Sequence, residues 1–387
     1  MNDSGAARYP AGMPSAPPQR LAQCLPAGWG EWAAPGVVLI FGALLRLWYL
    51  TQLVQAPDFA ALQQDPEVFD YYARAILSGD WTVRAGETDP EIRTTPYFRP
   101  PGYAFWLTVL YFFSGGSYLT PRLLNMLLSL AAVFLFYLLG RRLYGHGAGL
   151  IAAFLIATHG VVLYWEGEVN DPALFVFLLA CLFWSVYLWG WRWQARWAFA
   201  AGTIFGCYAL MRPNILAFGP IVAAWMLWVA WRRGMLPRVP GAWVALAGAT
   251  VLVIFPVTVR NYVVSGEFVP IATYFGENLL IGNSEESDGI TPWTPYLQEL
   301  EGTGRWSARD YVNVVKGLGR QLGKPDITHS EASSYFAAQA LAFMREHPWQ
   351  VLRLTAKKFV LLWSPKEITC NKVVEQERRF YSPLKFL

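Results

Sequence analysis

Residues 120–140 read TPRLLNMLLSLAAVFLFYLLG, and Arg141 and Arg142 follow at once. About 20 mostly apolar residues form a helix long enough to cross the hydrocarbon core of a bilayer. Basic residues beside such a helix favour the cytoplasmic side of the membrane. The stretch therefore predicts a membrane-spanning helix whose C-terminal end faces the cytoplasm.

Apolar stretches of this kind recur through most of the 387-residue chain. We expect further spans at 35–54, 148–165, 172–190, 197–211, 214–230 and 241–259. Charged residues make up only 15% of the chain, whereas soluble domains carry about 25%. The sequence therefore predicts an all-α polytopic membrane protein with about seven spans in a lipid bilayer. The small net charge of +4 points to no nucleic-acid partner.

One further apolar run, GYAFWLTVLYFF at 102–113, is too short to cross a bilayer comfortably. If this run does not span, the basic clusters at 141–142, 192–196 and 232–238 all fall on one side. The positive-inside rule favours that arrangement. We therefore predict an interfacial or re-entrant helix at 102–113.

This topology divides the chain into three parts. Residues 1–34, rich in Pro, Ala and Gly, are expected to form a flexible cytoplasmic tail. Residues 35–259 form the transmembrane bundle, which includes a helical external loop at 55–119. Residues 260–387 form a second external segment of mixed structure.

Three acidic residues open the helix expected in the first external loop: Asp65, Glu67 and Asp70. A carboxylate near the membrane surface is suited to act as a general base. Asp is also a favoured helix cap, so Asp65 has an ordinary structural interpretation. The residues alone favour the capping interpretation.

A second acidic group lies in the short loop after the third span. Glu166, Glu168 and Asp171 fall within the segment EGEVNDP. Acids at membrane depth are costly and usually functional. An external loop that merely follows the charge bias explains them equally well, and both interpretations stay open.

Four arginines are expected at the outer membrane edge: Arg99, Arg122, Arg212 and Arg260. The planar guanidinium group suits phosphate because it donates two parallel hydrogen bonds. Snorkelling to lipid headgroups is the alternative for each of them. Arg46 lies inside the first span, so we expect it to face the bundle.

Signals for other chemistries are missing from the sequence. It contains no Walker loop, GxSxG or HExxH motif, and no Cys or His spacing typical of zinc. We therefore predict no metal ligand set and no required cofactor, although a divalent metal is compatible with the residues. There is also no room for a Rossmann-like domain that would bind a nucleotide sugar.

The order of several motifs resembles the GT-C superfamily of integral-membrane glycosyltransferases. The resemblance is to the branch of aminoarabinose transferases and dolichyl-phosphate-mannose protein mannosyltransferase-like proteins (glycosyltransferase family 39-like). It extends from about Pro35 to the C-terminus. The motifs are DPEVFDYYARAILSGDW, YFRPPGYAFWL, RLLNMLLSL with LGRRLYG, YWEGEVNDPALF, MRPN, RNYVVSGEFVPI, GEN with IGNS, and FVLLWSPKEI.

The resemblance implies roles for particular residues. Asp65 takes the place of the catalytic acid, and Glu166 and Asp171 compete for that of a second acid. Arg212 and Arg260 correspond to arginines that contact the carrier phosphate, and Arg99 does so less securely. The remaining substrate-binding candidates are Glu67, Asp70, Tyr72, Arg122, Glu168, Asn261 and Asn283.

The implied function is a hexosyl or pentosyl transferase of the cell envelope. It would move a sugar from a polyprenyl-phosphate carrier to a lipid, glycan or protein hydroxyl with inversion. The expected location is the bacterial inner (plasma) membrane, with the active site facing the periplasm. A transporter or flippase of lipid-linked sugars is the alternative. A truncated inactive homologue is another, because family members usually continue for several spans beyond the point where this chain ends.

Overall fold

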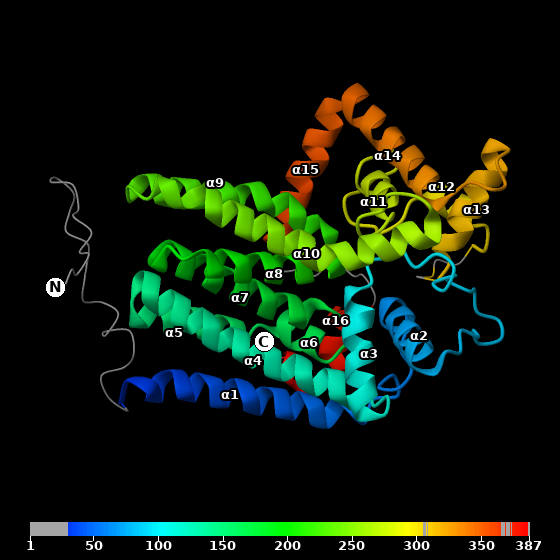
Figure 1. The fold of residues 1–387 in the computed structure, drawn as a ribbon. Coiled ribbons are helices and arrows are strands. Elements are labelled where there is room, and N and C mark those ends of the chain that lie inside the picture. The colour runs from blue at the N-terminus through cyan, green and yellow to red at the C-terminus, as the bar shows by residue number, and fades with distance from the viewer. Residues whose placement is uncertain are drawn as a thin grey trace.

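A computed structural model of the protein describes residues 30–304, 307, 309–364, 368, 372 and 374–385. Within these residues every regular element is a helix (Figure 1). Most of the predicted tail lies outside the described residues. The first helix begins at Gly30, five residues before the predicted start of the bundle.

The bundle is built from helices that run roughly side by side in Figure 1. They are α1 (Gly30–Leu53), α4 (Leu119–Tyr144), α5 (His146–Ala157), α6 (Gly160–Glu166), α7 (Pro172–Arg192), α8 (Ala195–Met211), α9 (Gly219–Arg232) and α10 (Val239–Ser265). Two 3-10 turns, η2 (Pro213–Phe218) and η3 (Leu236–Arg238), lead into α9 and α10. The bundle therefore extends beyond the predicted boundary at residue 259.

Among the described residues, five apolar stretches are long enough to cross a membrane, and six if the bent pair α5 and α6 counts as one span. The polytopic all-α prediction is confirmed, and the predicted number of about seven spans differs from the upper count of these candidates by one. The difference is α8, which has only 17 residues. The pair α5 and α6 bends by 54° because the chain leaves the helix at Thr158 and His159.

Small residues allow the spans to approach closely. A Cβ atom added to Gly202 of α8 would lie 2.1 Å from the backbone oxygen of Leu246 in α10. The hydroxyl of Thr250 in α10 donates to the backbone oxygen of Gly202 at 3.1 Å. Glycine contacts and hydroxyl hydrogen bonds of this type hold helices together where lipid provides no hydrophobic drive between them.

The predicted interfacial helix is α3 (Gly102–Ser114), with 13 residues. Figure 1 shows that it lies across one end of the bundle rather than along it. It packs against α2 (Asp65–Ser78) and against the end of α8, where a Cβ on Gly102 would lie 2.7 Å from the backbone carbon of Leu210. Its length and orientation agree with a helix that does not span.

The helices outside the bundle gather at the same end as α3 (Figure 1). They are α2, α11 (Phe275–Gly282), α12 (Pro295–Glu301), α13 (Tyr311–Leu322) and α14 (His329–Glu346). A core of Leu280, Leu297, Val314, Leu318 and Phe336 joins the last four. Both predicted external segments therefore meet at one end of the bundle.

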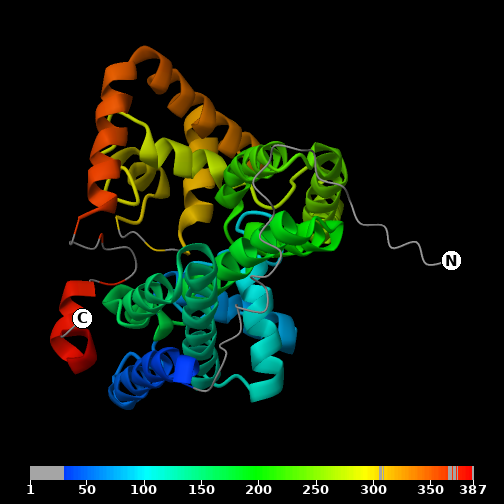
Figure 2. The same cartoon turned by 90° about the vertical axis from the view of Figure 1, so that its left-hand side faces the viewer.

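The C-terminal helices return toward the bundle. α15 (Pro348–Leu362) follows α14, and in Figure 2 the short α16 (Val374–Phe380) and α17 (Ser382–Lys385), drawn in red, lie below the lower end of α15. α17 contacts α1 and α6. The ring of Tyr381 packs edge-on against Tyr49 with 5.2 Å between centroids, which fixes α17 to the end of the first span.

Candidate functional site

Asp65 is the first residue of α2. Gln64 before it has φ 60° and ψ −133°, an unusual conformation for a residue with a side chain, and no side chain caps the helix. The Asp65 carboxylate instead accepts a hydrogen bond from Nη1 of Arg99 at 3.0 Å. The capping interpretation of Asp65 is therefore wrong, and its side chain, 29% exposed, faces Arg99.

Arg99 connects the segment 55–119 to the segment 260–387. Its guanidinium lies 5.6 Å from the ring centroid of Tyr274 and 5.3 Å from that of Tyr311, so each ring can make a cation–π contact. Tyr274 directly precedes α11, and Tyr311 begins α13. The segment 260–387 thus positions the arginine that pairs with Asp65.

Asp171 forms the second acidic centre at this end of the bundle. It precedes α7, and its two carboxylate oxygens accept from Nε and Nη2 of Arg212 at 3.1 and 2.9 Å. Burial raises the pKa of the Asp171 carboxyl, Arg212 opposes that rise, and the negative charge of Asp65 adds to it. The interaction between the two carboxylates indicates that Asp65 and Asp171 share one region.

The other two acids of this loop point elsewhere. Glu166 is completely buried and pairs with Nη2 of Arg46 at 2.7 Å, so Arg46 faces the bundle as predicted. Glu168 pairs with Lys372 at 2.8 Å, and Lys372 also contacts Asp58. Of the two acids that competed for the second site, Asp171 is the one whose carboxyl lies near enough to Asp65 to be influenced by its negative charge.

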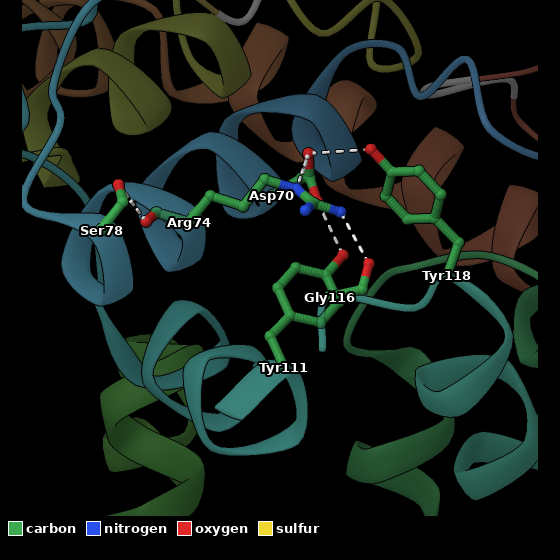
Figure 3. Close-up of polar contacts among 6 residues, drawn as sticks. All are labelled: Asp70, Arg74, Ser78, Tyr111, Gly116 and Tyr118. Carbon is green, nitrogen blue, oxygen red and sulfur yellow. Dashed lines mark hydrogen bonds and ion pairs between the residues drawn. The ribbon is translucent and has the colours of Figure 1, made fainter. Parts of the chain in front are cut away.

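Asp70 belongs to a network that joins α2 to α3 (Figure 3). Arg74 donates to both of its carboxylate oxygens, at 2.9 and 3.0 Å. The hydroxyls of Tyr111 and Tyr118 donate to Asp70 at 2.6 and 3.2 Å. Arg74 also donates to the backbone oxygen of Gly116 at 2.8 Å. Its partners make Asp70 a structural connector rather than a group that faces Asp65.

Arg260 lies near the end of α10 and faces α2. Its Nη1 donates to the hydroxyl of Tyr72 at 3.1 Å, and its Nη2 donates to the backbone oxygen of Pro96 at 2.9 Å. Asn261 provides another neutral acceptor. The contacts that Arg260 makes are thus with neutral groups, which leaves its positive charge available to an anion.

Several of the predicted binding residues donate hydrogen bonds to backbone oxygens. Arg122, buried in α4, donates to the backbone oxygens of Gly167 and Tyr118 at 2.7 and 3.1 Å. The amide of Asn261 donates to two backbone oxygens, and that of Asn283 donates to Leu279. Their positions indicate structural roles. Glu67 lies 3.5 Å from Arg309, at the side of α2.

The sequence did not identify Tyr274, Tyr311, Arg309 or Lys372 as members of this region. All four lie in the segment 260–387, where loops interrupt the periodicity. An arginine or aromatic residue there has no neighbour in the sequence that indicates its partner. Among the residues that the structure describes, no three His, Cys, Asp or Glu side chains form a group that would hold a metal ion.

A helix bundle with acids and arginines gathered at one end defines a polytopic membrane protein with a polar site beside the bilayer. Residues 98–259 match the family model described as dolichyl-phosphate-mannose-protein mannosyltransferase. The match confirms the resemblance to GT-C-type membrane glycosyltransferases. It includes Arg99, Asp171 and Arg212, whereas Asp65 and Arg260 lie outside the matched residues. No curated protein and no solved structure matches the chain.

The burial of Glu277 predicts that the stability of the protein depends measurably on pH. It is 1% exposed in α11, and burial raises the pKa of its carboxyl to about 8. The folded state therefore favours the protonated form of Glu277. The free energy of unfolding falls as pH rises from the pKa of this carboxyl in the unfolded chain, about 4.3, to its pKa in the folded protein.

Thermal denaturation in detergent at pH 6 to 8 should show a falling Tm for the wild type. Each pH unit in this window removes up to about 1.4 kcal/mol from the contribution of this group. Glu277→Gln should flatten that slope, while the exposed Glu285→Gln should not. Equal slopes in wild type and Glu277→Gln would contradict the prediction.

Proposed function

We propose that the protein transfers a sugar from a polyprenyl-phosphate carrier to an acceptor hydroxyl at the outer face of the membrane. The observation that carries the proposal is the placement of Asp65 and Asp171, each with an arginine partner, at the end of a bundle matched by a mannosyltransferase family. A carrier phosphate in the bilayer lies at this depth, where arginines suit it.

In the proposed reaction, Asp65 accepts the proton of the acceptor hydroxyl as its oxygen attacks the anomeric carbon of the sugar. The bond between that carbon and the phosphate oxygen breaks, and polyprenyl phosphate leaves with the electron pair. Attack from the face opposite the leaving group inverts the anomeric centre. Arg212 and Arg260 stabilise the negative charge on the departing phosphate. Asp171 positions Arg212.

A transfer assay with purified protein tests this function. Incubation with a polyprenyl-phosphate sugar should consume the donor and yield free polyprenyl phosphate in equal amount to the glycosylated acceptor. Movement of the donor between leaflets of a vesicle without its consumption would instead support a flippase.

The proposed orientation places α2 and α11–α14 outside the cell, in the periplasm of a bacterium. Ala85→Cys and Glu285→Cys, both at exposed positions, should react with an impermeant thiol reagent in intact spheroplasts. The background protein should have its native cysteines replaced by Ser. Gln194→Cys, between α7 and α8, should react only after lysis. The reverse pattern would overturn the orientation.

The phosphate role of Arg212 and Arg260 predicts a loss of donor affinity on replacement by Lys. Lysine keeps the charge but loses the planar fork. A hydrogen bond to a charged group contributes about 1.5–3 kcal/mol, so Arg212→Lys and Arg260→Lys should each weaken donor binding by roughly 10- to 100-fold.

The exposed Arg320→Lys on α13 provides the matched control and should bind the donor as the wild type does. Binding of polyprenyl phosphate, followed by intrinsic fluorescence in detergent, gives the affinity directly. If both lysine variants bind with wild-type affinity, the two arginines do not hold the phosphate.

A further inference from the structure

A small cavity of about 20 Å³ lies between the side of α2, the segment 90–100 and the start of α13. Its polar lining includes Arg99, Arg309 and the hydroxyl-bearing Tyr72, and the rest is largely aromatic and aliphatic. A volume of this size holds about one water-sized group. The cavity is adjacent to the candidate base, because Arg99 on its wall is the partner of Asp65.

Arg309, on the wall of this cavity, has buried hydrogen-bond donors without acceptors among the described residues. It is 4% exposed, and its Nη2 lies 3.5 Å from Oε1 of Glu67, a long contact for an ion pair. Its Nε and Nη1 have no hydrogen-bond acceptor within the described part of the chain. Leaving buried donors of a charged group unpaired is costly, and such groups usually mark an absent water, ion or ligand.

The charges around the cavity favour an anion. Arg99 and Arg309 both line it, and Arg260 reaches its wall through the hydroxyl of Tyr72 and the backbone oxygen of Pro96. The carboxylates in contact with these arginines are Asp65, bound to Arg99, and Glu67, beside Arg309. The charged residues that line the cavity itself are both arginines, whereas Asp65 and Glu67 are not part of its lining.

We propose that this cavity, through Arg309, binds one oxygen of a carboxylate carried by a substrate of the transfer. A carboxylate is flat and can insert a single oxygen into a space one water wide, whereas tetrahedral phosphate presents three bulky oxygens around the leading one. The identification of the ligand as a substrate rests on the proposed glycosyl transfer. The carboxylate belongs either to a uronic sugar or to an acidic acceptor.

Direct binding separates these sources and does not depend on turnover. Purified full-length protein in detergent is titrated with free glucuronate, with N-acetylglutamate amide, with inorganic phosphate, and with glucose as the neutral counterpart of glucuronate. Tm shifts and calorimetry provide the readouts. Binding of glucuronate indicates a uronic sugar, and binding of the glutamate derivative indicates an acidic acceptor. Glucose should not bind measurably.

Arg309→Gln should weaken binding of the preferred carboxylate at least tenfold, and Arg309→Lys should restore part of it by restoring charge. The exposed Arg320→Gln should bind as the wild type does. The Lys variant keeps the test valid if Arg309→Gln does not fold. The proposal is overturned if neither carboxylate binds, if phosphate binds in preference, or if Arg309→Gln binds normally. Failure of the transfer assay with intact carboxylate binding would instead contradict the proposed function alone.

Discussion

Replacing Asp65 by Asn is expected to lower turnover by about 10²–10⁴-fold while leaving the protein folded. The amide oxygen of Asn can still accept the hydrogen bond that Arg99 gives to the carboxylate at 3.0 Å. The substitution therefore keeps the contact and removes the ability to accept a proton. Because α2 has no side-chain cap, the change takes no capping bond from the helix.

The comparison requires a matched acid that lies outside the site. Asp80 follows α2 in the same loop and is exposed, so Asp80→Asn should transfer sugar at the wild-type rate. Thermal denaturation should show that all three proteins are folded, and single-turnover transfer should isolate the chemical step. Full activity in Asp65→Asn would exclude Asp65 as the base.

The positions of most spans follow from the sequence because apolar length alone determines whether a helix can cross lipid. The same reasoning separates α3 from the spans, since its apolar run is short and the basic clusters favour the topology in which it does not span. Length also explains the difference between the predicted number of spans and the number of candidates in the structure. The run at 197–211 has the composition of a span, but α8 ends at Met211, where Arg212 and Pro213 follow.

The membership of the site depends on contacts that no local pattern contains. Glu166 and Asp171 have similar surroundings in the sequence, and their distinction rests on partners 120 and 41 residues away, Arg46 and Arg212. Arg309 likewise faces α2 because the segment 260–387 folds against the segment 55–119. Sequence reasoning identified the acids and arginines as a group but could not assign their pairs.

The pairing of Arg46 with Glu166 carries the largest expected effect on stability. Both side chains are almost fully buried, at 2% and 0% exposure. Arg46 also donates to the hydroxyl of Ser129 and to the backbone oxygen of Ala157, at the break between α5 and α6. Removing one partner leaves a buried charge without compensation, which costs about 3–5 kcal/mol.

Arg46→Met and Glu166→Leu should therefore each lower the free energy of unfolding by about 3–5 kcal/mol, measured by titration with sodium dodecyl sulfate in mixed micelles. The double variant should recover most of that loss, because apolar residues of similar volume often replace a buried ion pair without cost. The proposed mechanism predicts that it still transfers sugar, because in that mechanism Glu166 stabilises the break in the bundle and the acids of the site are Asp65 and Asp171. A stable double variant without activity would instead support a catalytic role for Glu166. Additive losses from the two substitutions would show that the pair is not coupled.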